Sequence, residues 1–152
     1  MSYNELRKGR FSETNQIYFV TTVTHQRNQL FNDFSSAWIV VNAMKHLSDV
    51  GYVNSLSWVV MPDHVHWLIA QISEREQKLS KLMQRWKSSS KQRLNRKGVE
   101  GDIWQNEFFD RLLRSNENLT DKWRYVEMNP VRAGLCSEPD QYLYLGTPED
   151  IL

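Results

Sequence analysis

The spacing of hydrophobic residues changes several times along the chain, and each change marks a predicted element. Runs of β-branched and aromatic residues with a period of two predict strands, and apolar residues that recur every three or four positions predict helices. Asn32 or Asp33 can cap the first helix, Gly51 ends it, and Pro62-Asp63 between two apolar runs predicts a β-hairpin. These patterns predict a strand at 17–24, a helix at 33–48, and strands at 54–61 and 64–70.

The second half of the chain begins with a long amphipathic helix that starts near Lys78 and ends at Gly98. Segment 107–113 predicts a fourth strand, although a helix also fits its pattern. A last helix is predicted over 116–128, and Pro130 is expected to end it close by, because proline disfavours helical geometry at the residue before it. The apolar stripe of the long helix consists of Leu79, Leu82, Met83 and Trp86.

This order of elements is that of the split βαβ pattern of a ferredoxin-like sandwich. The predicted fold class is therefore α+β, with an antiparallel sheet of four to five strands and helices packed on one side of it. We expect one domain over 16–135 and a basic arm over 1–15. A tail is expected over 136–152, where two prolines and a glycine accompany the absence of any clear periodicity.

Composition excludes several classes of protein. A chain of 152 residues can bury a substantial core without covalent staples. Its single cysteine, Cys136, excludes an internal disulfide framework and a zinc site built from several cysteines. No segment approaches the roughly 20 apolar residues of a membrane span, so we expect a soluble, intracellular protein with no membrane partner.

Charge is distributed unevenly, although the formal net charge is only +1. The window 77–99 holds eight Lys or Arg residues and no acid, which leaves 11 basic and 18 acidic residues elsewhere. A cationic surface of this kind commonly meets phosphates, and a merely solvated helix face is the alternative. The cations that avoid the apolar stripe of the long helix are Lys81, Arg85, Lys87, Lys91 and Arg93.

Two histidines, His64 and His66, open the strand predicted at 64–70. Because side chains alternate across a strand, the two imidazoles share one face and can hold a metal ion together. The alternative is a pair of half-buried histidines that are simply hydrogen-bonded. The pair therefore needs a third ligand before it indicates a metal site.

Tyr125 and Asn129 are four residues apart on the last predicted helix, so they lie on one face, clear of the apolar stripe. A tyrosine near a helix end usually packs its ring and shows its hydroxyl to water. Asn129 before a proline is equally explained as a residue that caps the helix. The stripe itself consists of Leu119, Trp123 and Val126.

Four sequence blocks between Tyr18 and Leu135 change the interpretation of these residues. They are MPDHVHWLI, LSKLMQRWK, IWQNEFFDR and RYVEMNPVRAGL. In order and spacing they resemble the single-tyrosine HUH transposases, specifically the REP-associated tyrosine transposases of bacteria. The resemblance implies a ferredoxin-like nuclease domain that cuts and rejoins single-stranded DNA through a 5′-phosphotyrosine intermediate.

The same resemblance implies a role for each candidate residue. Tyr125 falls on the nucleophile, and His64, His66 and Asn129 fall on the ligands of a divalent cation, Mn²⁺ or Mg²⁺. Two neutral imidazoles and an amide leave such an ion fully cationic toward phosphate, and nitrogen ligands favour Mn²⁺. Lys122, at i−3 from Tyr125, is a candidate for a proton or phosphate contact.

The implied substrate is a hairpin from a repetitive extragenic palindrome (REP) with a short single-stranded flank. Arg7, Lys8, Arg10 and Arg27 are expected to contact this DNA together with the cations of the long helix, and affinity should fall steeply with salt. The resemblance favours a monomer over a dimer and places the protein in the bacterial cytoplasm, at the nucleoid. Whether one chain or two would build the active site stays open.

Two other function classes compete with a metal-dependent DNA transesterase. A catalytically idle protein of this fold could recognise the palindrome without cutting it, but the histidine pair, Tyr125 and Asn129 are all present. A small-molecule metallohydrolase is disfavoured, because no further acidic or histidine ligand stands near the pair and because one helix is cationic.

Overall fold

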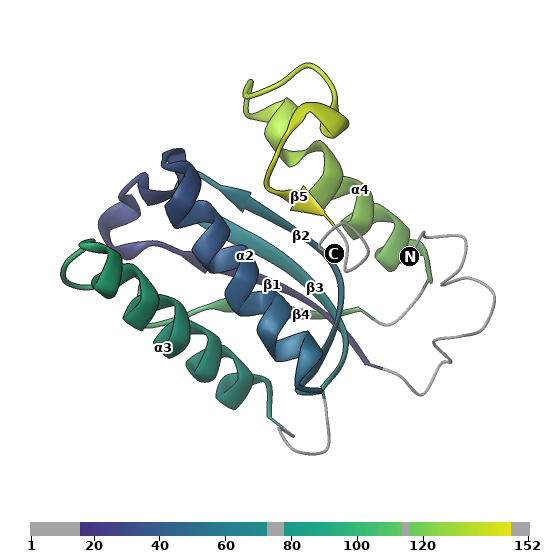
Figure 1. Cartoon of the computed structure of the whole chain (residues 1–152). Helices are drawn as coiled ribbons and strands as arrows, with labels where there is room; N and C mark the ends of the chain where they lie inside the picture. Colours follow the sequence, from purple (N-terminus) through teal and green to yellow (C-terminus); the bar gives the residue numbers. More distant parts are fainter. Residues whose placement is uncertain (1–15, 73–77, 114–115, 147–152) are drawn as a thin grey trace.

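An antiparallel sheet with the strand order β4-β1-β3-β2-β5 runs through the computed structural model, which describes residues 16–72, 78–113 and 116–146 (Figure 1). The strands are β1 (Ile17–Val23), β2 (Val53–Met61), β3 (His64–Ile72), β4 (Phe109–Leu113) and β5 (Leu145–Gly146). The helices are α2 (Phe34–Asp49), α3 (Leu79–Lys97) and α4 (Asn116–Arg132), and the short 3-10 turns are η2 (His25–Arg27), η3 (Leu30–Asn32) and η4 (Pro139–Gln141).

The elements predicted from periodicity are confirmed, with boundaries within about two residues for the strands and for α2 and α3. Asp33 caps α2 through a hydrogen bond from the Ser36 backbone N–H to its carboxylate. Segment 109–113 is a strand, so the alternative of a helix there is wrong. None of the helices among the described residues is long and apolar enough to cross a membrane.

The predicted end of the last helix is wrong, because α4 continues through Pro130 to Arg132. A proline within a helix removes one backbone hydrogen bond but does not forbid the next turn. Here the Ala133 N–H reaches the Asn129 carbonyl at 3.0 Å and the Leu135 N–H reaches the Pro130 carbonyl at 2.9 Å, which closes the helix end. The extra turn brings Arg132 onto the helix.

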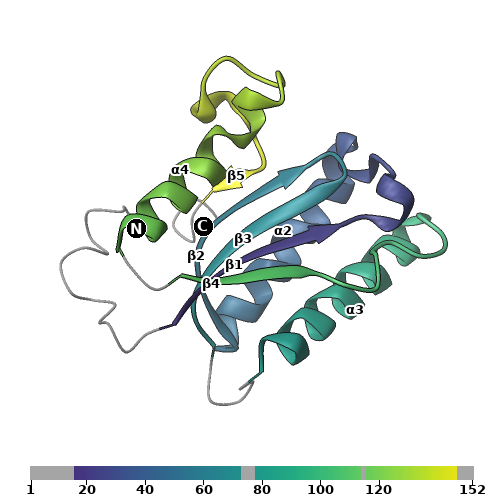
Figure 2. The same cartoon turned by 180° about the vertical axis from the view of Figure 1, so that it is seen from behind.

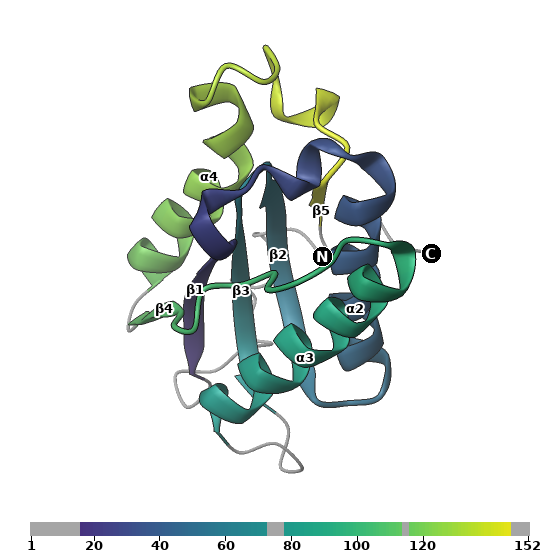
Figure 3. The same ribbon diagram turned by 90° about the vertical axis from the view of Figure 1, so that its left-hand side faces the viewer.

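Helices cover both faces of the sheet (Figure 3). α2 and α3 pack on the face that carries Val65, Trp67 and Ile69 of β3. α4 packs on the opposite face, against Leu68 and Ala70. The prediction of helices on one side is therefore correct for α2 and α3 and wrong for α4. Figure 2 shows the sheet from the side on which α4 lies.

The tryptophans of the sheet and of α3 belong to the core rather than to a surface for nucleobases. Trp58, Trp67 and Trp86 are buried, as their positions in the sequence predict. The Trp86 ring lies 5.7 Å from the ring of Trp67 and 4.7 Å from that of Trp104, centroid to centroid. These contacts hold α3 on the sheet by its apolar stripe.

Candidate active site

His66 is held on the α4 face of the sheet by its neighbours on β1. In the β1–β3 register it pairs with Thr21, whose Oγ1 lies 2.8 Å from His66 Nδ1. The Phe19 ring stacks on the imidazole with centroids 5.1 Å apart. The side chain is 5% exposed, so both its position and its orientation are fixed by the sheet.

Burial lowers the pKa of His66 to about 3, and the positive charges of His64, Arg132 and Lys122 act in the same direction. The imidazole is therefore neutral at physiological pH. A neutral imidazole is the form that binds a metal ion.

His64 is oriented by the carboxylate before it. Its Nδ1 lies 2.7 Å from Asp63 Oδ1, and Asp63 Oδ2 accepts a hydrogen bond from Arg27 Nη1 at 3.2 Å. Burial raises the pKa of Asp63, but hydrogen bonding and attraction from His64, followed by Arg27, outweigh it, so the pKa lies below its usual value. An ionised carboxylate only accepts, so the Nδ1–H of His64 donates and Nε2 is left for a ligand.

The two imidazoles meet edge to face, with ring centroids 4.8 Å apart. Each has its Nδ1 engaged by an oxygen of a neighbouring residue, which leaves Nε2 as the nitrogen for a further partner. Metal-binding histidines in proteins are generally oriented in this way through the other ring nitrogen. The alternative is a pair of histidines that are only hydrogen-bonded. In the described residues these hydrogen bonds engage Nδ1 of each ring.

Tyr125 reaches this pair from α4. Its ring lies edge to face with His66, with centroids 5.3 Å apart, and it contacts Phe19 at 5.8 Å. The side chain is 40% exposed, whereas the apolar stripe of the same helix is buried. The predicted nucleophile and the histidine pair therefore meet within one chain.

Asn129 follows one turn later on the same helix face and is 8% exposed. Lys122 lies over Phe19, which pairs with Leu68 on β3. Tyr125, one turn after Lys122, contacts His66, which is nearer the start of β3. α4 therefore runs toward the start of β3 and carries Asn129 in that direction. No hydrogen bond in the described residues occupies the Asn129 side chain, and its role as a ligand stays a prediction.

The histidine pair needs a third ligand, and the residue types around it limit what that ligand can be. Within residues 16–72, 78–113 and 116–146 no group of three or more His, Cys, Asp or Glu side chains could hold a metal ion. An all-histidine or carboxylate-rich centre is thus absent from the described part, and the predicted set of two histidines and one amide stays a prediction. Its members come from the start of β3 and from the last turns of α4.

Two cations lie over the Tyr125 ring. The Nζ of Lys122 is 5.3 Å from the ring centroid, and the Cζ of Arg132 is 4.3 Å from it. Lys122 is a predicted site residue, but sequence reasoning missed Arg132. The spacing of Tyr125, Asn129 and Arg132 (i, i+4, i+7) could have found it, because these positions share one helix face.

The structure does not bring the cations predicted on α3 to the histidine pair, because α3 covers the opposite face of the sheet. Lys87 donates to the carbonyls of Gln105 and Glu107 at 2.7 and 3.0 Å. Burial lowers the pKa of Lys87, against a raising effect of Glu107. Lys87 thus ties the segment before β4 to α3.

The other predicted DNA contacts are differently placed. Lys81 is exposed and Arg93 is half-buried, whereas Lys91 pairs with Asp102 at 3.3 Å. Arg85 stacks over the Tyr52 ring at 4.4 Å. Arg27, with 64% of its side chain exposed, stands beside the site through Asp63, and Arg7, Lys8 and Arg10 lie outside the described residues.

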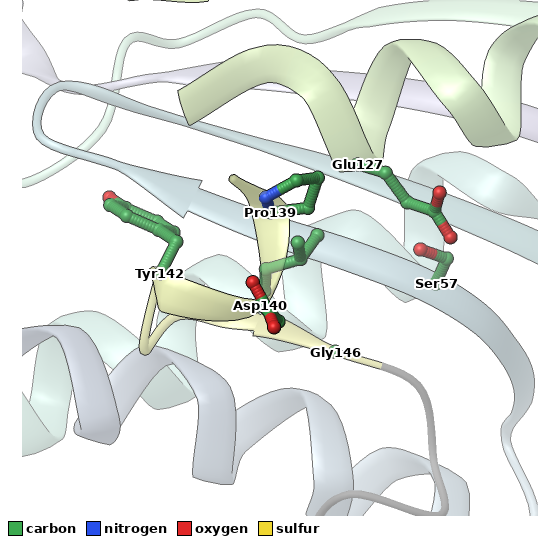
Figure 4. Close-up of a pocket in the computed structure, with 7 residues that line it drawn as sticks. Ser57, Glu127, Pro139, Asp140, Tyr142 and Gly146 are labelled. Atoms are coloured by element: carbon green, nitrogen blue, oxygen red, sulfur yellow. The ribbon is translucent and has the colours of Figure 1, made fainter. Parts of the chain in front are cut away.

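A cavity of about 430 Å³ lies between α4 and β5, apart from these residues (Figure 4). None of the predicted site residues lines it. Glu127, on its wall, accepts a hydrogen bond from Trp123 Nε1 at 2.9 Å, so this carboxylate is engaged within α4. The lining residues are Ser57, Glu127, Pro139, Asp140, Tyr142, Leu145 and Gly146.

Asp63→Asn is expected to weaken Mn²⁺ binding about 10- to 100-fold, because a neutral amide orients His64 less firmly than a carboxylate does. Calorimetric titration of the purified protein with Mn²⁺ measures this affinity. Asp49→Asn, which removes an exposed carboxylate paired with Lys45 on α2, is the matched control. Equal affinity in the Asp63 variant and the wild type would show that the carboxylate does not support the ligand.

Comparison with known proteins places the chain in a family. The family model described as Transposase IS200 like matches residues 12–129. A Haemophilus influenzae protein, provisionally named a REP-associated tyrosine transposase, is 23% identical over 150 residues, covering 89% of this chain and 81% of that protein. The REP-associated tyrosine transposase of Escherichia coli K12 is 31% identical over 95 residues, covering 62% of this chain and 54% of that protein.

Among solved structures, a REP-associated tyrosine transposase bound to a REP hairpin superposes with a TM-score of 0.71 at 18% identity. The match covers 86% of this chain and 75% of the other. It confirms the predicted α+β fold, a five-stranded antiparallel sheet with helices α2, α3 and α4.

Proposed function

The chain belongs to the IS200-like transposase family, and we propose that it cleaves and rejoins single-stranded DNA at hairpin sites through a covalent bond to Tyr125. The observation that carries the proposal is the meeting of Tyr125 with His66 at 5.3 Å between ring centroids, within one chain. The proposed catalytic domain spans 16–135.

In the proposed step the phenolic oxygen of Tyr125 loses its proton and forms a bond to the scissile phosphorus. The bond from phosphorus to the 3′ oxygen breaks, and that oxygen takes up a proton to become a free 3′-hydroxyl. The 5′ fragment end stays on the protein as a phosphotyrosine. A phenolate is a better leaving group than an alkoxide, so a 3′-hydroxyl can reverse the step without a nucleotide cofactor.

His64, His66 and Asn129 would hold the divalent cation in this proposal, through two imidazole nitrogens and the amide oxygen. The engaged Nδ1 atoms of the two histidines, and the position of Asn129 one turn after Tyr125 on α4, fit such a role. When bound, Mn²⁺ or Mg²⁺ would offset negative charge that builds on the phosphate. Lys122, over the Tyr125 ring, would contact the phosphate or the departing proton.

The proposed substrate is a REP hairpin with a single-stranded flank, and the proposed place of action is the bacterial nucleoid. Two features support it: the relative whose structure was solved is bound to a REP hairpin, and α3 presents exposed cations. Because α3 and the site lie on opposite faces of the sheet, the DNA would have to wrap around an edge to meet both. A monomer is proposed, because Tyr125 contacts His66 within one chain.

A labelled hairpin oligonucleotide with its flank, incubated with the protein and Mn²⁺, tests the proposal. A band that migrates with the protein on a denaturing gel, and that disappears with a chelator, is the expected covalent adduct. Absence of an adduct with every palindromic substrate and metal would overturn the proposal. DNA binding without an adduct would indicate a catalytically idle palindrome-binding protein.

Neutralising the α3 surface is expected to weaken DNA binding without slowing cleavage at saturating DNA. In the variant Lys81→Gln, Lys91→Gln, Arg93→Gln, the slope of log affinity against log salt should become shallower by about 2, at about 0.7 for each lost phosphate contact on a single strand. Binding is measured by fluorescence anisotropy at several salt concentrations. Lys45→Gln on α2 is the control, and a lower rate at saturating DNA with unchanged affinity would contradict the prediction.

A further inference from the structure

Arg132 has contacts with the predicted nucleophile that the roles assigned so far do not explain. Its guanidinium carbon lies 4.3 Å from the centroid of the Tyr125 ring. Its Nη2 also donates to the Tyr125 backbone carbonyl at 2.6 Å. The Arg132 side chain therefore contacts both the ring and the backbone of Tyr125, which lies two helical turns earlier.

This contact depends on the continuation of α4 beyond Pro130. Because the helix continues to Arg132, positions 125, 129 and 132 fall on one face. Pro130 has no N–H for the carbonyl of Val126, four residues before it, and Arg132 donates to the adjacent carbonyl, that of Tyr125. The geometry therefore ties the end of α4 to Tyr125.

The guanidinium keeps most of its hydrogen-bonding capacity. It has five N–H groups in a planar fork, and the Tyr125 carbonyl takes one of them. Arg132 is exposed, and within the described residues no carboxylate forms an ion pair with it. A cation beside a nucleophile that has no carboxylate partner among the described residues is suited to an anionic group, and its fork matches the two oxygens of a phosphate.

We propose that Arg132 is a catalytic residue that binds a non-bridging oxygen of the phosphate attacked by Tyr125 while it restrains the tyrosine ring. This inference rests on the proposed function. It adds a group that would stay in contact with the phosphate before cleavage, in the phosphotyrosine and during rejoining. A lysine at this position would keep the charge but lose the planar stack and the fork.

The test compares adduct formation by Arg132→Gln, Arg132→Lys and the wild type in the full chain, under single-turnover conditions with saturating hairpin DNA and Mn²⁺. Losing one preorganised donor to a developing charge is expected to slow adduct formation about 100-fold in Arg132→Gln. Arg132→Lys should recover part of this loss. Arg124→Gln, an exposed cation on the same helix and next to Tyr125, is the matched control and should stay within about twofold.

A second substrate separates phosphate binding from a structural role. A methylphosphonate at the scissile position removes one charged oxygen, so Arg132 has less to bind. With at least one of the two diastereomers, the difference between wild type and Arg132→Gln should shrink to about threefold or less, because removing both partners of a contact is not additive. The reverse reaction of the isolated adduct should be slowed as the forward reaction is.

The outcomes separate cleanly. An unchanged rate in Arg132→Gln, or the same loss on both methylphosphonate diastereomers as on the normal substrate, would overturn the inference while leaving the proposed function standing. No adduct from the wild-type protein would overturn the proposed function and the inference with it.

Discussion

Replacing Tyr125 with phenylalanine is expected to abolish the covalent adduct while leaving the fold and most of the DNA affinity intact. The substitution removes the only atom that attacks phosphorus in the proposed step, so the adduct rate should fall by at least about a thousandfold. The ring contacts with His66 and Phe19 do not need the hydroxyl. DNA affinity should change less than about tenfold, since one hydrogen bond contributes about 1 kcal/mol.

Denaturing gels with labelled hairpin DNA measure the adduct, and circular dichroism checks the fold. Tyr18→Phe is the matched control. Tyr18 lies on β1 and packs with the core on the α2 and α3 face, and its hydroxyl bonds only to the nearby Gln16 in the described residues. An adduct that survives in Tyr125→Phe would assign the nucleophile to another residue. Loss of adduct in both variants would point to general damage.

The strand that carries the histidine pair was predictable because its pattern is local. Alternation along 64–70 places His64 and His66 with Leu68 and Ala70, and the structure confirms this division, since Leu68 and Ala70 face α4. The stripe of α4 was predictable for the same reason, which left Tyr125 at its exposed flank. Periodicity identifies which side of an element is buried.

Periodicity does not say which face of the sheet a helix covers, and that decides where the α3 cations stand. The answer lies in the connections. β1 and β2 are parallel to each other, and so are β3 and β4. The crossover from β1 to β2 through α2 and the crossover from β3 to β4 through α3 run in opposite directions across the sheet. Because the two strand pairs also point in opposite directions, both helices lie on one face. The handedness of such crossovers is nearly always the same.

α4 follows the same rule once β5 is known. β5 lies beside β2 at the far edge from β4 and is parallel to β4, so a crossover from β4 to β5 of the same hand must pass over the opposite face. β5 has two residues, Leu145 and Gly146, within a tail that shows no periodicity. A strand this short leaves no pattern in the sequence, so the face of α4 could not be derived from the residues alone.

The distribution of cations follows from this topology. Arg132 was missed because Pro130 predicts a helix end before it. The tertiary packing that keeps α4 helical past Pro130 leaves no signal in the local sequence. The α3 cations were correctly predicted to avoid the apolar stripe, but they face away from Tyr125. The cations proposed to act on the reacting phosphate and those proposed to hold DNA at a distance thus lie on opposite faces of the sheet.

His64→Ala is expected to lower the adduct rate by at least about 100-fold and to remove high-affinity Mn²⁺ binding, while Tyr125 keeps its place against His66. Loss of an oriented ligand costs more than the 10- to 100-fold typical of its supporting residue. His64 is the better choice than His66, because His66 is buried against Phe19 and Thr21 and its loss would disturb the sheet.

Mn²⁺ titration and adduct formation should fall together in His64→Ala, with the melting temperature close to that of the wild type. His46→Ala is the matched control, since His46 is exposed on α2 across the sheet from the site. Rescue of the adduct by higher Mn²⁺ would agree with a weakened metal site, because a lost ligand lowers affinity for the ion while Tyr125 is unchanged. Normal Mn²⁺ binding with a slow adduct would instead make His64 a contact to DNA, and normal values for both would remove it from the site.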